Sequence, residues 1–147
     1  MKEIIFNRIM EIINDRIEST KKAISAAKES RDNETKCSSG DKYETGRTMM
    51  NFELEKSRVL LNKTLNLKNE LSQIDLHKQN KTVTLGSLVR VTNACYFISV
   101  GIGKLEVENE TVIAISLASP IGKLLNNKNV GNKFKFRGEE ITITEII

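Results

Sequence analysis

The chain has 147 residues, of which 29% are charged and 5% aromatic, with no tryptophan and a formal net charge of +4 at pH 7. This length suits one domain or two small ones, and so few aromatic side chains argue against a base-stacking surface. The positive charge permits a loose affinity for nucleic acid or an acidic partner but does not establish one.

Cysteine and histidine are too sparse for a zinc site of the usual kind. The chain contains only Cys37, Cys95 and His77, whereas a structural zinc ion takes four such ligands, commonly at short spacings. Scattered thiols, no secretory leader and no apolar run of roughly 18 residues predict a cytoplasmic protein without a membrane segment.

The first third of the chain predicts one long amphipathic helix from residue 2 to about residue 30. Its apolar positions recur at steps of three and four. Further along, the predicted seam consists of small residues, which would let a partner helix approach closely. The polar stretch 31–40 loses the period and predicts a loop. The seam residues are Ile5, Ile9, Ile12/Ile13 and Ile17, followed by Ala23, Ile24, Ala26 and Ala27.

A second helix is predicted from Asp41 to about Leu76, a span without proline. Neither helix would be stable alone in water, so we expect an antiparallel hairpin whose turn is an exposed tip, far from the rest of the chain. The apolar stripe of this helix is predicted to consist of Met50, Leu54, Leu61, Leu65, Leu71 and Ile74.

Beyond a polar hinge at residues 77–81 the pattern changes to short β-branched or aromatic runs separated by turn residues. Ser119 and Pro120 have the residue types of a helix N-cap and first turn, so residues 119–125 predict one short helix. The fold class is therefore α+β, with residues 82–147 forming a small, mostly antiparallel sheet with one helix on a face. The predicted strands are 88–91, 96–100, 112–115, 134–136 and 141–143.

The candidate functional residues are Asp41 and Glu44, at the predicted tip. Three positions apart at the start of a helix, two carboxylates project from one face. The same spacing is also a capping box, with Asp41 as N-cap and Glu44 reaching back from N3. Asp32 and Glu34 extend an acidic tip over residues 32–47, which could equally be ordinary loop charge.

Two separated stretches resemble one family. The segment SPIGKLL at residues 119–125, with the glycine-containing turns that follow it, is similar to the C-terminal domain of the bacterial Gre factors (GreA/GreB). That domain has an FKBP-like fold. Gly40-Asp41-x-x-Glu44 resembles the tip of the same family's N-terminal coiled coil, in the same order along the chain. The resemblance implies a coiled coil over residues 1–76, a linker at 77–81 and an FKBP-like domain over 82–147.

The resemblance also implies a mechanism. Gre factors insert their coiled coil through the secondary channel of bacterial RNA polymerase, where the tip carboxylates help to hold a second Mg²⁺. The polymerase's own active site then cleaves a backtracked transcript. Asp41 and Glu44 would be these carboxylates, sharing Mg²⁺ only in the complex. The chain would be a monomer, not an enzyme, without a cofactor of its own, and would meet nucleic acid only within the elongation complex.

Two other functions stay open. After Glu44 the family usually continues with Asn, a small residue, Glu and Tyr, whereas this chain has Thr45, Gly46, Arg47 and Thr48. A regulator that occupies the channel and inhibits or modulates the polymerase without supporting cleavage is the first alternative. The second is a prolyl isomerase with a helical arm, in which Tyr96 and Phe97 would line a shallow pocket instead of the sheet core.

Overall fold

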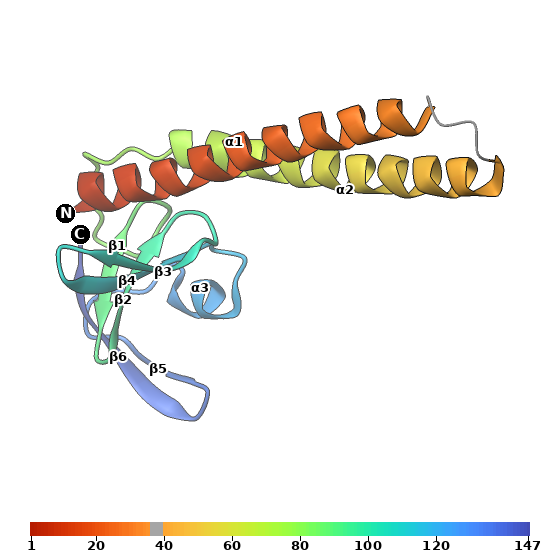
Figure 1. The fold of residues 1–147 in the computed structure, drawn as a ribbon. Coiled ribbons are helices and arrows are strands. Elements are labelled where there is room, and N and C mark those ends of the chain that lie inside the picture. The colour runs from red at the N-terminus through yellow and green to blue at the C-terminus, as the bar shows by residue number, and fades with distance from the viewer. Residues whose placement is uncertain (36–39) are drawn as a thin grey trace. The chain divides into compact units, whose positions relative to one another are not determined.

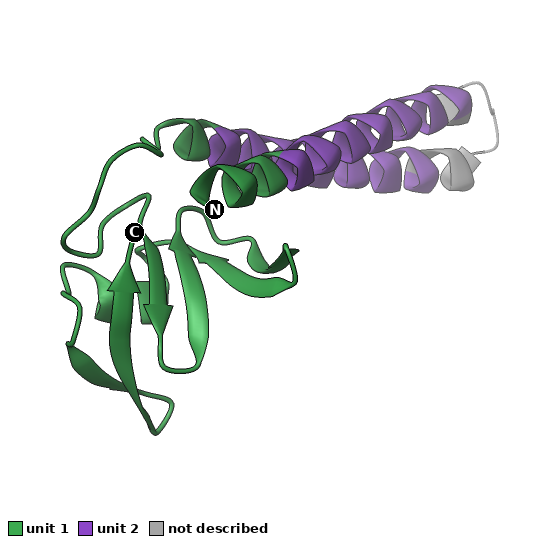
Figure 2. Ribbon diagram, turned by 90° about the vertical axis from the view of Figure 1, so that its left-hand side faces the viewer, with its two compact units in different colours: residues 1–10, 69–147 green, residues 11–68 purple. Residues whose placement is uncertain are grey.

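The computed structural model describes the backbone of residues 1–35 and 40–147, and the side chains of the same residues except 34, 35 and 40–44. Two long helices, α1 (Lys2–Thr35) and α2 (Gly40–Ser72), come first along the chain, and a β-rich region follows. The chain divides into two compact units, residues 11–68 and residues 1–10 with 69–147 (Figure 2). The predicted division into 1–76, 77–81 and 82–147 stays a prediction.

The two helices within residues 11–68 lie side by side and run antiparallel (Figures 1 and 2). The hairpin expected from the apolar period is therefore confirmed. Its boundaries differ from the prediction, because α1 continues through Thr35 across polar residues that lack the period, and α2 ends at Ser72. Polar residues do not prevent a helix when its neighbour supports it, so loss of the period alone did not mark the end.

A six-stranded sheet follows, in the order β3-β4-β2-β1-β6-β5. The strand pairs are antiparallel except for β2 and β4, which run parallel. The chain leaves β2, forms β3 at the edge and returns as β4 between them, so β4 has the direction of β2. The strands are β1 (Leu88–Val91), β2 (Ala94–Ile98), β3 (Gly103–Val107), β4 (Glu110–Ile115), β5 (Lys133–Phe136) and β6 (Glu139–Ile146).

Strand β3 was missing from the sequence prediction. It contains only two buried apolar side chains, Leu105 and Val107, alternating with charged ones. Its connection to β4 is a two-residue turn in which both Glu108 and Asn109 have positive φ, at 49° and 66°. A turn of this kind matches the twist of the paired strands. The strand before this turn was missed because two apolar residues among charged ones give only a weak strand pattern.

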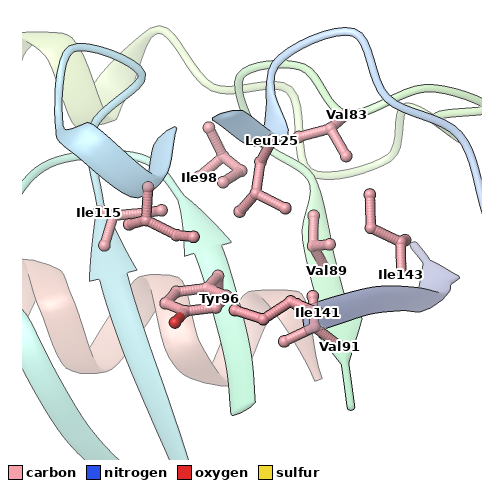
Figure 3. Packing of buried hydrophobic residues seen from close by; sticks show 10 residues of the cluster. Val83, Val89, Val91, Tyr96, Ile98, Ile115, Leu125, Ile141 and Ile143 are labelled. Carbon is pink, nitrogen blue, oxygen red and sulfur yellow. The ribbon is translucent and has the colours of Figure 1, made fainter. Parts of the chain in front are cut away.

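The core of the β-rich part lies against one face of the sheet, where side chains from β1, β2, β4 and β6 meet α3 (Pro120–Leu125) (Figure 3). Leu125 from α3 is fully buried among Val89, Ile98 and Ile143, which confirms one short helix packed on the sheet. The alternate side chains of the central strands, such as Leu88 and Phe97, are buried as well.

One charged cluster joins three strands. Arg90 on β1 forms an ion pair with Glu110 on β4 and a second, at 3.0 Å, with Glu145 on β6. Cys95 on β2 stands opposite Arg90 in the register. The hydrogen bond to Glu110 raises the pKa of Arg90. The cluster therefore ties β1 to its neighbour β6 and, across β2, to β4, on the face opposite the α3 core.

Helix α3 begins as the sequence predicts. The Ser119 hydroxyl accepts a hydrogen bond from the Gly122 amide at 3.0 Å and donates one to the Ser116 carbonyl at 2.7 Å. Pro120 occupies the first turn, where its missing N–H costs nothing. Gly122 is buried against this cap, and a Cβ built there would collide with the Ser116 carbonyl oxygen and the Ser119 hydroxyl. The glycine is therefore required by close packing.

We predict that Gly122→Ala lowers the free energy of unfolding by about 2–3 kcal/mol, because the added methyl group overpacks the cap. Gly101→Ala is the matched control, since a Cβ there meets nothing within 4 Å, and it should change stability by less than about 0.5 kcal/mol. Chemical denaturation of both variants measures the difference. Equal stability of the two would contradict this account of Gly122.

Candidate functional site

The candidate site lies where the helix pair turns, so its position depends on the seam between the helices. Within residues 11–68 the least exposed positions follow each other at steps of three and four along both helices. This is the spacing of a coiled-coil seam. The seam positions are Ile13, Ile17, Thr20, Ile24, Ala27 and Arg31 on α1, and Met50, Leu54, Ser57, Leu61, Thr64 and Lys68 on α2.

Burial along this seam decreases toward the turn. Ile13, Ile17 and Leu54 are buried, whereas Ile24 and Met50, which are nearer the turn, are only half-buried. Because hydrophobic stabilisation follows buried apolar area, the described positions near the turn contribute less to holding the helices together. The seam therefore contributes less packing near the turn than it does further along the helix pair.

Three predicted seam residues lie elsewhere. Ala23 and Ala26 are exposed, and Leu65 is 41% exposed. The place of Leu65 is taken by Thr64, a residue that an apolar pattern passes over. Two threonines are buried in the seam, and each donates a hydrogen bond from its hydroxyl to a carbonyl of its own helix. Thr20 donates to the Arg16 carbonyl at 2.7 Å, and Thr64 donates to the Leu60 carbonyl at 2.8 Å. Such bonds remove the cost of burying a hydroxyl.

Asp41 and Glu44 are both in the first turns of α2, directly after the turn of the hairpin. A capping box would require Asp41 to be the residue directly before the helix. Because α2 begins at Gly40, Asp41 instead lies inside the helix. The side chains of Asp41 and Glu44, and those of Glu34 and Cys37, lie outside the part of the chain that the structure describes. Their proposed roles therefore stay predictions.

The described residues beside the pair carry an apolar surface that sequence reasoning missed. Met49 and Phe52 are 60% and 70% exposed on α2, and they border a cleft of about 300 Å³. The sequence contains a signal for this surface, since Met49 and Phe52 are three positions apart and neither coincides with the seam positions 50 and 54. On α1, Arg31 pairs with Asp32 at 3.6 Å. The surroundings of the acidic pair thus combine charged and apolar side chains.

Other residues with candidate chemistry are placed in packed surroundings. Tyr96 and Phe97 are buried in the sheet, so they form core instead of lining an open pocket. Cys95 is buried too, and burial raises the pKa of its thiol to about 11. An unperturbed thiol titrates near 8.5, so the reactive thiolate of Cys95 is disfavoured at neutral pH.

Outside the undescribed stretch near the turn, no three His, Cys, Asp or Glu side chains gather as a metal site would require. Within the same residues, no helix has the length and apolar character needed to cross a bilayer.

The chain is similar to a solved structure of the transcription factor Gfh1. That structure is 18% identical to this chain over 96% of this chain and 92% of that one, with a TM-score of 0.35. No protein-family model matches the chain, and no curated protein matches it. At this identity and TM-score the likeness carries no weight for function, which has to be argued from the chain's own residues.

We predict that Leu54→Ala lowers the stability of the helix pair by about 2–4 kcal/mol, because Leu54 is 2% exposed and its loss leaves a cavity in the seam. Leu65→Ala makes the same chemical change at an exposed position of the same helix, and should cost less than about 0.5 kcal/mol. Thermal unfolding followed by circular dichroism tests both. An equal loss of stability in the two variants would instead support the seam predicted from the sequence, which contains both residues.

Proposed function

We propose that this chain is a Gre-like transcription elongation factor, which binds bacterial RNA polymerase, inserts its helix pair into the secondary channel and stimulates cleavage of backtracked transcripts. Asp41 and Glu44 would be the residues donated to the polymerase active site. The cleavage itself belongs to the polymerase, so the chain is not an enzyme. It would act as a monomer in the cytoplasm and meet nucleic acid only within the elongation complex.

The observation that carries this proposal is the position of the acidic pair along the helix hairpin. Asp41 and Glu44 start α2 immediately after the turn, at the end of the hairpin that an inserted coiled coil would present first. A second observation comes from the β-rich part, where residues 119–125, which resemble the family's C-terminal domain, form the capped helix α3. The FKBP-like character of that part belongs to the same proposal.

The chemistry of the pair fits this role. Mg²⁺ takes oxygen ligands, keeps several waters and is usually held by one or two carboxylates together with substrate phosphates. A second metal ion beside a phosphodiester stabilises the attacking and leaving oxygens of an in-line displacement. Asp41 and Glu44 would supply carboxylate oxygens to such an ion and orient it. Two carboxylates alone are too few for a complete cage, which favours a site shared with the polymerase.

A channel regulator without cleavage activity is the second candidate, and the residues after the pair favour it. Thr45 and Arg47 are exposed in α2, at positions where the Gre family usually has Asn and Glu. A cation in place of a carboxylate next to the pair lowers the local affinity for Mg²⁺. The prolyl isomerase alternative depended on Tyr96 and Phe97 lining a pocket, and both residues are buried in the sheet.

We predict that the wild-type protein accelerates transcript cleavage in reconstituted backtracked complexes of bacterial RNA polymerase. Asp41→Asn and Glu44→Gln should each reduce this stimulation by about 10- to 100-fold, the usual loss when a group that positions a metal is removed. Both variants keep the size of the side chain and remove only the charge. Cleavage is measured as the release of short 3′ fragments from end-labelled RNA.

Glu55→Gln is the matched control, because Glu55 is an exposed glutamate further along α2. It should leave cleavage unchanged. If instead the wild type, Asp41→Asn and Glu44→Gln all slow RNA synthesis equally without causing cleavage, the chain is a channel regulator. Absence of binding to the polymerase would overturn both readings.

A further inference from the structure

A cleft of about 640 Å³ lies in the unit formed by residues 1–10 and 69–147. Its walls come from the start of α1, from the segment that follows α2 and from the end of β6. Both ends of the chain lie close together there, in both views (Figures 1 and 2). The lining residues are Lys2, Leu76, His77, Lys78, Gln79, Asn80, Lys81, Ile146 and Ile147. None of them takes part in the proposed cleavage function.

Lys2 is the first unusual feature of this cleft. It is only 7% exposed, which is rare for a lysine, and its ammonium donates a hydrogen bond to the Lys78 carbonyl at 3.2 Å. Burial lowers its pKa, and the nearby Asp75 carboxylate opposes this effect. An ammonium carries three N–H donors. The one bond to a neutral carbonyl uses only part of this donor capacity.

Asn80 is the second unusual feature. Its Oδ1 accepts a hydrogen bond from the Thr84 hydroxyl at 3.1 Å. Its amide nitrogen is buried and has no hydrogen-bond partner among the residues that the structure describes. A buried donor without an acceptor costs about 1–3 kcal/mol, so natural proteins seldom keep one without a reason. An acceptor brought by a ligand would remove this cost.

The remaining lining residues extend the same chemistry. Lys78 and Lys81 are exposed and add two cations, and no Asp or Glu side chain lines the cleft. Leu76 and Ile146 supply an apolar wall. The volume falls within the range of small-molecule sites, which combine apolar walls with a few convergent polar groups. The side chains that line the cleft thus offer donors and positive charge, and the Asp75 carboxylate near Lys2 offsets part of that charge.

We propose that this cleft binds the phosphate group of a small phosphorylated molecule. A phosphate carries about two negative charges and three strong acceptor oxygens. Lys2 and the Asn80 amide would contact these oxygens from the buried side, with Lys78 and Lys81 at the rim. A carboxylate has one charge and two oxygens, and would leave more of these donors unpaired.

The test uses the full chain, with inorganic phosphate, pyrophosphate and AMP as probes, titrated by NMR at constant ionic strength. We expect saturable shifts of the amide signals of residues 76–81 in the wild type. Asn80→Asp should weaken binding by at least about tenfold, since a carboxylate keeps the acceptor for Thr84 but replaces the free donor by a negative charge. Lys78→Gln/Lys81→Gln removes two exposed charges and should weaken binding without affecting folding.

Lys104→Gln is the matched control, because Lys104 is an exposed lysine on β3 that does not line the cleft. It should bind the probes as the wild type does. Tighter binding of AMP than of phosphate identifies an organic phosphate as the ligand, and equal binding identifies the free ion. Unsaturable shifts in the wild type at millimolar probe, or an equal loss of binding in Lys104→Gln, would overturn the proposal.

Discussion

The packing of α1 against α2 is the interaction on which the candidate site depends. Helices of 34 and 33 residues cannot hold their length alone in water, and most of their stability has to come from tertiary packing. The seam in residues 11–68 supplies it through isoleucines and leucines at steps of three and four, interrupted by Thr20 and Thr64. Because these hydroxyls bond to their own helices, they impose no pairing on the partner and leave the apolar positions to fix the register. The same seam thins toward the turn, where the acidic pair begins α2.

Most of the fold follows from local sequence patterns, because it is built from elements whose signals are local. The apolar period gives two helices, alternation of β-branched residues gives five strands, and Ser119-Pro120 gives the start of α3. The errors have physical reasons too. Leu65 is one of the apolar residues of α2 but does not lie in the seam. The average spacing of about 3.5 residues between the other seam positions places Thr64 there instead. Strand β3 has only Leu105 and Val107 to mark it, and its pairing beside β4 is decided by the sheet as a whole.

The parts that sequence could not predict are those made by residues distant along the chain. Arg90, Glu110 and Glu145 stand on three strands, and only the register of the sheet brings them together. Lys2, Asn80 and Ile146 likewise line one cleft from positions at the start, middle and end of the sequence. Neither cluster leaves a local motif, so no spacing rule could have found it. In contrast, Asp41 and Glu44 are a local pattern, and the sequence alone was sufficient to single them out.

The two proposed sites share one property, which is that each would be half of a coordination or hydrogen-bonding set. In the proposed function Asp41 and Glu44 would provide acceptor oxygens, and a bound cation needs more ligands than two side chains offer. The cleft provides a buried ammonium and an unpartnered amide, which are the donors that a bound phosphate would accept from in our proposal. A self-contained enzyme site brings together nucleophile, base and stabilising groups. Sites that are incomplete in this way are instead typical of a protein that acts through what it binds, which is the role that we propose for this chain at both places.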